Sequence, residues 1–195
     1  LYWDADRVKL NEIHFLPIDN VSREDFMFRS GQIHVTSSIP TEKIEVYKDE
    51  YPNNININPY YGTYYYRINL GKSPLDNKLI RQALSLSIDR EKITEKVAKG
   101  GQIPAFSFTP PDPNGYYPPT RLEFNPQKAK QLLGQAGFTE ENLPTFELLY
   151  NTSEGHQKIA EAMQQMWKET LGVNIVLTNT DWKVYLSRQN TSDFE

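Results

Sequence analysis

Residues 74–93 read Pro-Leu-Asp-Asn-Lys-Leu-Ile-Arg-Gln-Ala-Leu-Ser-Leu-Ser-Ile-Asp-Arg-Glu-Lys-Ile, and this segment carries the strongest structural signal in the chain. Two helix starts follow one another: Asp76 is placed to cap a first helix, and Asp89 a second helix that ends at Gly100-Gly101. Apolar residues recur at helical spacing on one side of each predicted helix, at Leu79, Ile80, Ala83 and Leu84, then at Ile93 and Val97. None of these side chains is reactive, so the segment predicts a helical corner of scaffold.

The composition is that of an ordinary globular protein. The chain has 195 residues, 38% hydrophobic and 24% charged, with a net charge of -4. Basic and acidic residues are mixed, which argues against a nucleic-acid partner or an anionic membrane surface, because both require clustered Lys and Arg. The absence of cysteine excludes disulfides and thiolate metal sites. No apolar run approaches the roughly 18 residues of a membrane helix, and without an initiator Met or signal pattern we expect an internal fragment of a longer protein.

The first third of the chain predicts strands separated by helices. Alternating apolar residues predict strands at 8–16 and 32–36, and capping patterns predict helices that start near Ser22 and at Pro40-Thr41. Residues 54–66 form a long extended stretch that ends in a run of tyrosines. Such an order indicates an α/β fold with a mixed or parallel sheet.

The remainder predicts a loop, a helix and a crossover unit. Residues 103–121 are rich in proline and aromatic residues and predict an ordered loop, and Asn125-Pro126 predicts a helix that ends at Gly137. A strand at 145–150, a helix at 153–171 and a strand at 173–178 predict a right-handed parallel crossover. Asp181 then caps a final helix from Trp182 to about Arg188.

Catalytic and metal chemistry have little support in the sequence. His14, His34 and His156 lie far apart and show no paired spacing for a metal, and neither a phosphate-binding loop nor a nucleophile elbow is present. We therefore predict no catalytic residues, no metal site and no cofactor. His156 alone has a suggestive position, because it follows a predicted strand at the start of a helix, where ligands bind in open α/β sheets.

The segment at 74–93 closely resembles the signature region of the peptide-binding and oligopeptide-binding proteins that serve bacterial ABC importers, the family 5 extracellular solute-binding proteins. The resemblance continues in order along nearly the whole chain, through the segments 62–69, 101–111, 125–138, 148–153, 167–173 and Trp182. It implies a periplasmic-binding-protein-like (type II) α/β fold of two lobes that close on a peptide. Residues 1–61 then resemble part of the first lobe and residues 62–195 much of the second, with Gly62 near a hinge crossing.

The resemblance also implies candidate ligand-binding residues: Ser37, Ser38, Tyr64, Tyr65, Arg67, His156, Trp182, Leu186, Gln189 and Asn190. Ser37 and Ser38 match a stretch whose backbone borders the peptide, and His156 matches a histidine near the ligand carboxylate. Family members often carry an acid where Arg67 stands, so an Arg67 that faces the cleft implies a preference for acidic groups. The residues of the last helix match a wall of side-chain pockets.

The function implied is capture of short peptides in an extended form, outside the cytoplasm, and delivery to the permease of an ABC importer. The protein is then a monomer, periplasmic or lipid-anchored at the outer face of the cell membrane, and not an enzyme. Two alternatives stay open. The same fold can bind another solute, such as a nickel complex, a sugar or an opine, or it can act as a sensor or regulatory module.

Overall fold

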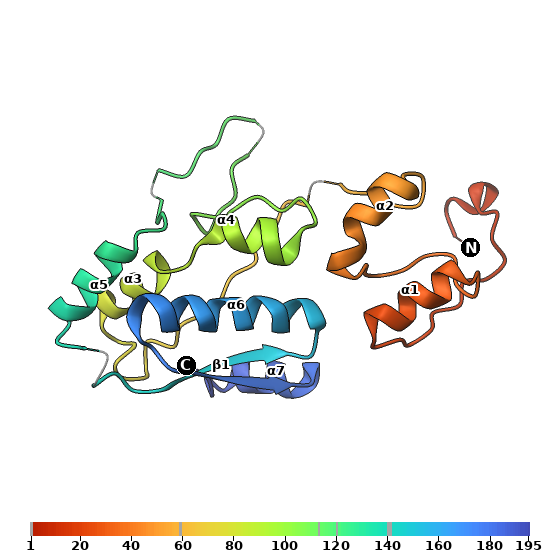
Figure 1. The fold of residues 1–195 in the computed structure, drawn as a ribbon. Coiled ribbons are helices and arrows are strands. Elements are labelled where there is room, and N and C mark those ends of the chain that lie inside the picture. The colour runs from red at the N-terminus through yellow and green to blue at the C-terminus, as the bar shows by residue number, and fades with distance from the viewer. Residues whose placement is uncertain (1, 59, 113, 120, 140–141) are drawn as a thin grey trace. The chain divides into compact units, whose positions relative to one another are not determined.

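The computed structural model describes residues 2–58, 60–112, 114–119, 121–139 and 142–195. The chain forms two compact units, Leu1–Pro40 and Thr41–Glu195. Figure 1 shows the elements of each unit along the chain. The lobe boundary placed between residues 61 and 62 is a different division and stays a prediction.

The first unit is built around one helix. After the short 3-10 helix η1 (Ala5–Arg7), α1 (Val21–Arg29) begins at Asn20, whose side chain accepts a hydrogen bond from the backbone N–H of Arg23. The helix therefore starts before Ser22, and Asn20 provides the cap. Asp25, which is buried, pairs with the Arg29 guanidinium at 2.9 Å, one helical turn later.

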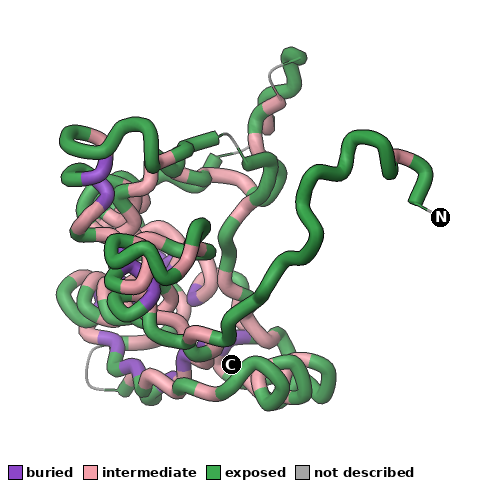
Figure 2. Tube along the Cα trace, turned by 90° about the vertical axis from the view of Figure 1, so that its right-hand side faces the viewer, coloured by how far each residue is buried: buried purple, intermediate pink, exposed green. Residues whose placement is uncertain are grey.

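The prediction of strands at 8–16 and 32–36 was wrong. Neither segment pairs with another strand in the described part of the chain, and residues 5–17 are exposed throughout, as the green trace near the N-terminus in Figure 2 shows. His14 and His34 accordingly lie on irregular backbone. Alternation of apolar residues fits a strand, but a strand also needs a neighbour to accept and donate its backbone hydrogen bonds.

The second unit opens with a short helical pair and an extended segment. A 3-10 turn, η2 (Thr41–Lys43), leads into α2 (Ile44–Glu50), as predicted from Pro40-Thr41. In the described residues from 54 to 66 the chain has neither helix nor strand. The mixed sheet expected for the first third is thus not present in the described structure.

The helical corner at 74–93 is confirmed, with one correction. Helix α3 (Lys78–Leu86) is capped by Asn77, whose Oδ1 accepts from the Leu79 N–H at 2.9 Å, so Asp76 is not the cap. Asp89 caps α4 (Arg90–Lys92) as predicted, and its carboxylate accepts from the Lys92 N–H at 3.0 Å. The chain then continues into a π-helix, η3 (Ile93–Ala98), which ends at Lys99 in the left-handed conformation, just before the two glycines.

Helix α5 (Pro126–Gln135) follows the proline-rich loop and matches its prediction. Asn125 caps it by accepting from the Lys128 N–H at 2.9 Å, and proline occupies the first helical turn.

The described residues of the loop 103–121 contain no helix or strand. Two of its aromatic residues make contacts: the Arg121 guanidinium lies over the Phe106 ring, and Phe108 packs on Tyr65.

The crossover is confirmed as a parallel pair of strands. Strand β1 (Phe146–Asn151), helix α6 (Glu154–Leu171) and strand β2 (Ile175–Thr180) follow in order, and β1 pairs in parallel with β2, Phe146 opposite Ile175. Ser153 caps α6, and Gly172 ends it at a φ of 71°.

Helix α7 (Trp182–Asn190) begins at Asp181, whose side chain accepts from two backbone N–H groups. Its Arg188 binds both carboxylate oxygens of Glu147 on β1, at 3.1 and 2.7 Å.

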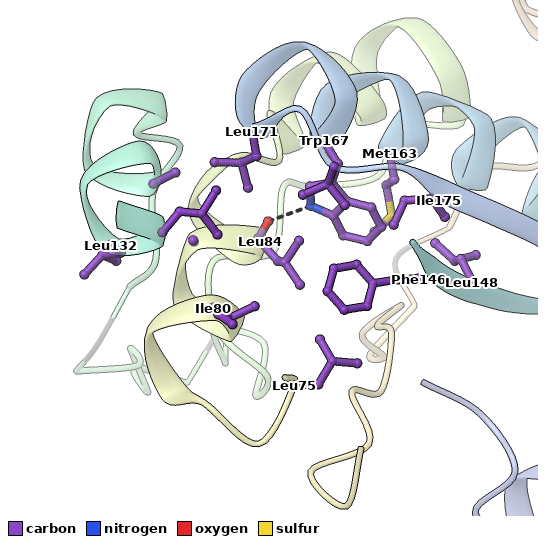
Figure 3. Packing of buried hydrophobic residues seen from close by; sticks show 14 of the residues in the cluster. Leu75, Ile80, Leu84, Leu132, Phe146, Leu148, Met163, Trp167, Leu171 and Ile175 are labelled. Atoms are coloured by element: carbon purple, nitrogen blue, oxygen red, sulfur yellow. Dashed lines mark hydrogen bonds between the residues drawn. The ribbon is translucent and has the colours of Figure 1, made fainter. Parts of the chain in front are cut away.

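One hydrophobic core joins these elements. Buried residues of α3, α5, β1, α6 and β2 form a single cluster, and Figure 3 shows the Trp167 indole among Leu84, Phe146 and Met163. The indole Nε1–H donates to the backbone carbonyl of Leu84 at 2.9 Å. This hydrogen bond ties α6 to the end of α3 inside the core.

We expect Trp167→Phe to destabilise the fold. The change removes the indole N–H and leaves a cavity where Trp167 is only 8% exposed, and together these losses should lower the free energy of unfolding by about 2 kcal/mol. Trp182→Phe is the control, because Trp182 is 59% exposed and should cost less than about 0.5 kcal/mol. Urea denaturation measures both; equal losses would contradict this account of the core.

Two glycines should respond in opposite directions to alanine. Gly172→Ala should cost about 1 kcal/mol, because the left-handed conformation at the end of α6 is unfavourable for a residue with a Cβ. Gly134→Ala should stabilise by about 0.5–1 kcal/mol, because Gly134 lies in α5 and nothing lies within 4 Å of the added Cβ. Thermal denaturation tests the pair, and a shift of the same sign in both variants would contradict the prediction.

Candidate functional site

The centre of the candidate site is a hydrogen-bonded group of two tyrosines and a histidine. The Tyr64 hydroxyl lies 2.9 Å from Nδ1 of His156 and 3.3 Å from the Tyr66 hydroxyl. Tyr66, together with Ile68, packs against the hydrophobic core. Because side chains of an extended chain alternate in direction, Tyr64 lies on the same side as these two. The core thus fixes the position of the tyrosine segment and of His156 relative to it.

His156 is where the sequence placed it, just after the carboxyl end of β1 and in the first turn of α6. Its backbone N–H faces the Ser153 side chain that caps the helix. Partial burial lowers the pKa of His156 from its ordinary 6.5, and a helix N-terminus also disfavours a positive charge. The imidazole is therefore neutral at pH 7.

The direction of the hydrogen bond with Tyr64 decides which imidazole nitrogen carries the proton. Burial raises the pKa of Tyr64 and of Tyr66, so both phenols are protonated, and the nearby Tyr185 phenol adds to this effect. A Tyr64 hydroxyl that donates to Nδ1 leaves the His156 proton on Nε2. In this tautomer His156 presents one free N–H donor beside the amino end of α6.

Tyr65 and Arg67 lie on the other side of the same extended segment. The Tyr65 ring meets the Phe108 ring edge to face, with centroids 4.9 Å apart. The Arg67 guanidinium carbon lies 5.9 Å from the centre of the Tyr65 ring, and its Nη2 donates to the Tyr65 hydroxyl at 3.4 Å. This hydrogen bond raises the pKa of Arg67, which remains a cation.

Helix α7 contributes a second aromatic group. Trp182 stacks on Tyr185 with centroids 5.7 Å apart, and Gln189 donates to the Tyr185 hydroxyl at 2.6 Å. Trp182 and Leu186 are exposed, as is Asn190, the last residue of the helix. The indole face and the Leu186 side chain therefore offer apolar surface to a ligand.

Sequence reasoning missed three members of this arrangement: Tyr66, Phe108 and Tyr185. Tyr185 had a signal, because it lies three residues after Trp182 and four before Gln189, spacings that bring helical side chains together. Phe108 had none, since only the fold brings the loop to Tyr65.

Ser37 and Ser38 belong to the first unit. Both the backbone N–H and the hydroxyl of Ser37 donate to Oε1 of Glu24, at 2.6 and 3.0 Å, so these donors satisfy a buried carboxylate of α1. Ser38 is exposed. Contact of either serine with a ligand stays a prediction.

Gly62, the predicted hinge, occupies a tight place in the second unit. Its N–H donates to the Tyr60 carbonyl at 3.0 Å, and a Cβ at this position would lie 2.5 Å from the Tyr60 ring. Tyr60 is 92% exposed, so its ring can turn away from an added Cβ, and this contact by itself does not require glycine. Hinge motion at Gly62 stays a prediction.

The described residues offer recognition chemistry. They contain no group of three or more His, Asp or Glu side chains placed to hold a metal ion. None of the described helices is long and apolar enough to cross a membrane. The site supplies instead aromatic faces, a cation and a neutral imidazole donor, which suit a polar organic ligand with apolar groups.

The sequence resembles peptide-binding proteins along its whole length. It is 40% identical over 201 aligned residues to the periplasmic oligopeptide-binding protein OppA of Salmonella typhimurium, an alignment that covers all of this chain and 37% of that relative. The chain thus spans little more than a third of the length of the curated relatives it matches.

Two solved structures share the fold. The Escherichia coli murein tripeptide binding protein MppA superposes with a TM-score of 0.85 at 39% identity, over 92% of this chain and 36% of that one. Haemophilus influenzae OppA, in complex with the peptide RPPGFSPFR, gives a TM-score of 0.81 at 32% identity, over 93% of this chain and 37% of that one. The predicted periplasmic-binding-protein-like α/β fold is confirmed, as a part of the complete fold.

The family described as bacterial extracellular solute-binding proteins, family 5 Middle, matches residues 1–195. Its members are solute-binding proteins and not enzymes, in agreement with the recognition chemistry of the site. The chain therefore belongs to the family 5 bacterial extracellular solute-binding proteins.

Proposed function

We propose that the complete protein is the extracytoplasmic solute-binding component of an ABC importer, and that it captures short peptides between two lobes and delivers them to the permease. The observation that carries the proposal is the 40% identity to an oligopeptide-binding protein, in an alignment that covers all of this chain. The protein acts in the periplasm or from a lipid anchor at the outer face of the cell membrane, as a monomer. It needs no cofactor.

The extended tyrosine segment supports main-chain recognition of a peptide. From residue 63 to residue 68, no backbone N–H or C=O has a hydrogen-bond partner in the described structure. Exposed backbone in an extended form offers a regular series of donors and acceptors to a second extended chain. Such bonds involve no ligand side chain, so they give affinity for many peptide sequences.

The side chains around this segment supply the remaining contacts. His156 donates its Nε2–H to a peptide carboxylate beside the amino end of α6, where the helix dipole favours a negative charge. Trp182, Leu186, Gln189 and Asn190 line side-chain pockets from α7, and Tyr64 and Tyr65 border the peptide. Ser37 and Ser38 contribute from the first lobe, and Gly62 permits the hinge rotation that closes the lobes.

Binding by the full-length protein tests the proposal. Isothermal titration with tripeptides to pentapeptides of mixed sequence should give dissociation constants of about 1 μM or below, about −8 kcal/mol. Native mass spectrometry of the purified protein should find bound peptides. If no peptide binds, or if a sugar, opine or nickel complex is found in their place, the proposal is wrong.

We expect His156→Ala to weaken binding of a free-carboxylate tripeptide by about ten- to a hundredfold, in line with the loss of one hydrogen bond to a charged group. The loss should be smaller for the C-terminal amide of the same peptide. His34→Ala is the control, an exposed histidine of the first unit. In NMR titrations of the parent protein, the free-carboxylate peptide should raise the pKa of His156, because a nearby anion favours the imidazolium. An unchanged pKa would exclude this contact.

A further inference from the structure

Arg67 differs from the other arginines of the second unit in its partners. Residues 41–195 contain five arginines, and in the described structure four of them bind carboxylate or backbone carbonyl oxygens. These four are Arg81, Arg90, Arg121 and Arg188. Arg67 forms no ion pair with a described Asp or Glu, and its one hydrogen bond goes to a phenol. Its charge is therefore uncompensated within the part of the chain that the structure describes.

The segment that carries Arg67 is held in place. Tyr66 and Ile68, its two chain neighbours, pack against the hydrophobic core. Since side chains of an extended chain alternate, the core contacts of these neighbours direct Arg67 away from the core. Tyr65 and Arg67 are both exposed on that side.

One aromatic ring lies beside the Arg67 guanidinium, and a second ring packs on the first. The Tyr65 ring is 5.9 Å from its carbon atom, and Phe108, 69% exposed, packs edge to face on Tyr65. The Tyr65 hydroxyl occupies one of the five guanidinium N–H donors, which leaves four for a ligand. A guanidinium held against a ring loses less conformational freedom on binding than a free one, so it is partly pre-organised for a planar acceptor.

We propose that Arg67, Tyr65 and Phe108 form a subsite for the acidic side chain of a bound peptide. The Arg67 fork donates to the Asp or Glu carboxylate, and the two rings contact the methylene groups beside it. This subsite rests on the proposed function, and it adds a preference of ligand that main-chain hydrogen bonds cannot provide. A lysine at the same ligand position meets a like charge and binds less well.

The test compares peptides that differ in one side chain. Full-length protein is titrated with three tetrapeptide series, Ala-Xaa-Ala-Ala, Ala-Ala-Xaa-Ala and Ala-Ala-Ala-Xaa, in which Xaa is Glu, Gln or Lys. At one of these positions the Glu peptide should bind about five- to tenfold more tightly than the Gln peptide. The Lys peptide should bind more weakly than the Gln peptide. The preference should shrink as salt is raised, since salt screens accessible charges.

Variants assign the preference to Arg67. In Arg67→Gln the ratio of Glu to Gln affinity should fall to about one, and in Arg67→Glu the order of Glu and Lys should reverse. Arg67→Lys should retain part of the preference, because it keeps the charge and loses the fork. Arg121→Gln is the matched control, an exposed arginine beside an aromatic ring on the same unit, and should retain the full ratio.

The outcomes separate this subsite from the proposed function. If Glu and Gln peptides bind equally well to the parent protein, the subsite is wrong while peptide binding stands. If no tetrapeptide binds, both proposals fail. C-terminal amides of the same peptides identify the source of the carboxylate: the Glu preference should persist in them, and its loss would show that Arg67 binds the chain end.

Discussion

The hydrogen bond from the Trp167 indole to the Leu84 carbonyl is the contact on which the second unit depends. It joins α6, the middle of the parallel crossover, to the end of α3, the first helix of the helical corner, across 83 residues of sequence. The bond is buried, so its loss exposes a carbonyl to an apolar surrounding and not to water. The indole ring also fills the space between β1 and the helices. One side chain therefore fixes both the packing and the relative position of the corner and the crossover.

That core positions the candidate site through Tyr66. Its ring packs on the core and its hydroxyl reaches Tyr64, which in turn reaches His156 at the start of α6. The tyrosine segment has no ladder partner in the described structure, so side-chain contacts hold it in place of backbone bonds. This arrangement leaves the backbone of the segment available to a ligand while its position stays fixed. A segment paired in a sheet would satisfy the same backbone groups internally and offer nothing to a peptide.

Local signals in the sequence predicted most helices and both strands of the second unit. Most wrong predictions concern features that depend on contacts between residues far apart in the sequence. Caps at Asp89, Asn125 and Asp181 were predicted correctly, because a cap depends only on the backbone N–H groups of the next turn. The cap of α3 is Asn77 and not Asp76. Both side chains can accept a hydrogen bond from a backbone N–H of the first turn, so the sequence alone does not decide between these neighbouring residues. The predicted strands at 8–16 and 32–36 failed because a strand requires a partner that its own sequence does not reveal. Among the candidate site residues, the place of His156 after a strand was predicted correctly, whereas Phe108 reaches Tyr65 only through the fold.

In the proposed function, the site combines a general means of binding with one that selects. Backbone groups from 63 to 68 would treat all peptides alike, and aromatic surfaces would accept many side chains at similar energy, so neither would separate one peptide from another. A fixed charge does separate them, because an opposite charge gains a hydrogen-bonded pair and a like charge is repelled. Arg67 suits this role because no described carboxylate pairs with it. A carboxylate neighbour would neutralise the guanidinium, as Glu147 neutralises Arg188, and would weaken its attraction for an acidic ligand. The phenol of Tyr65 orients the guanidinium without neutralising it, so the charge is held in position and remains available.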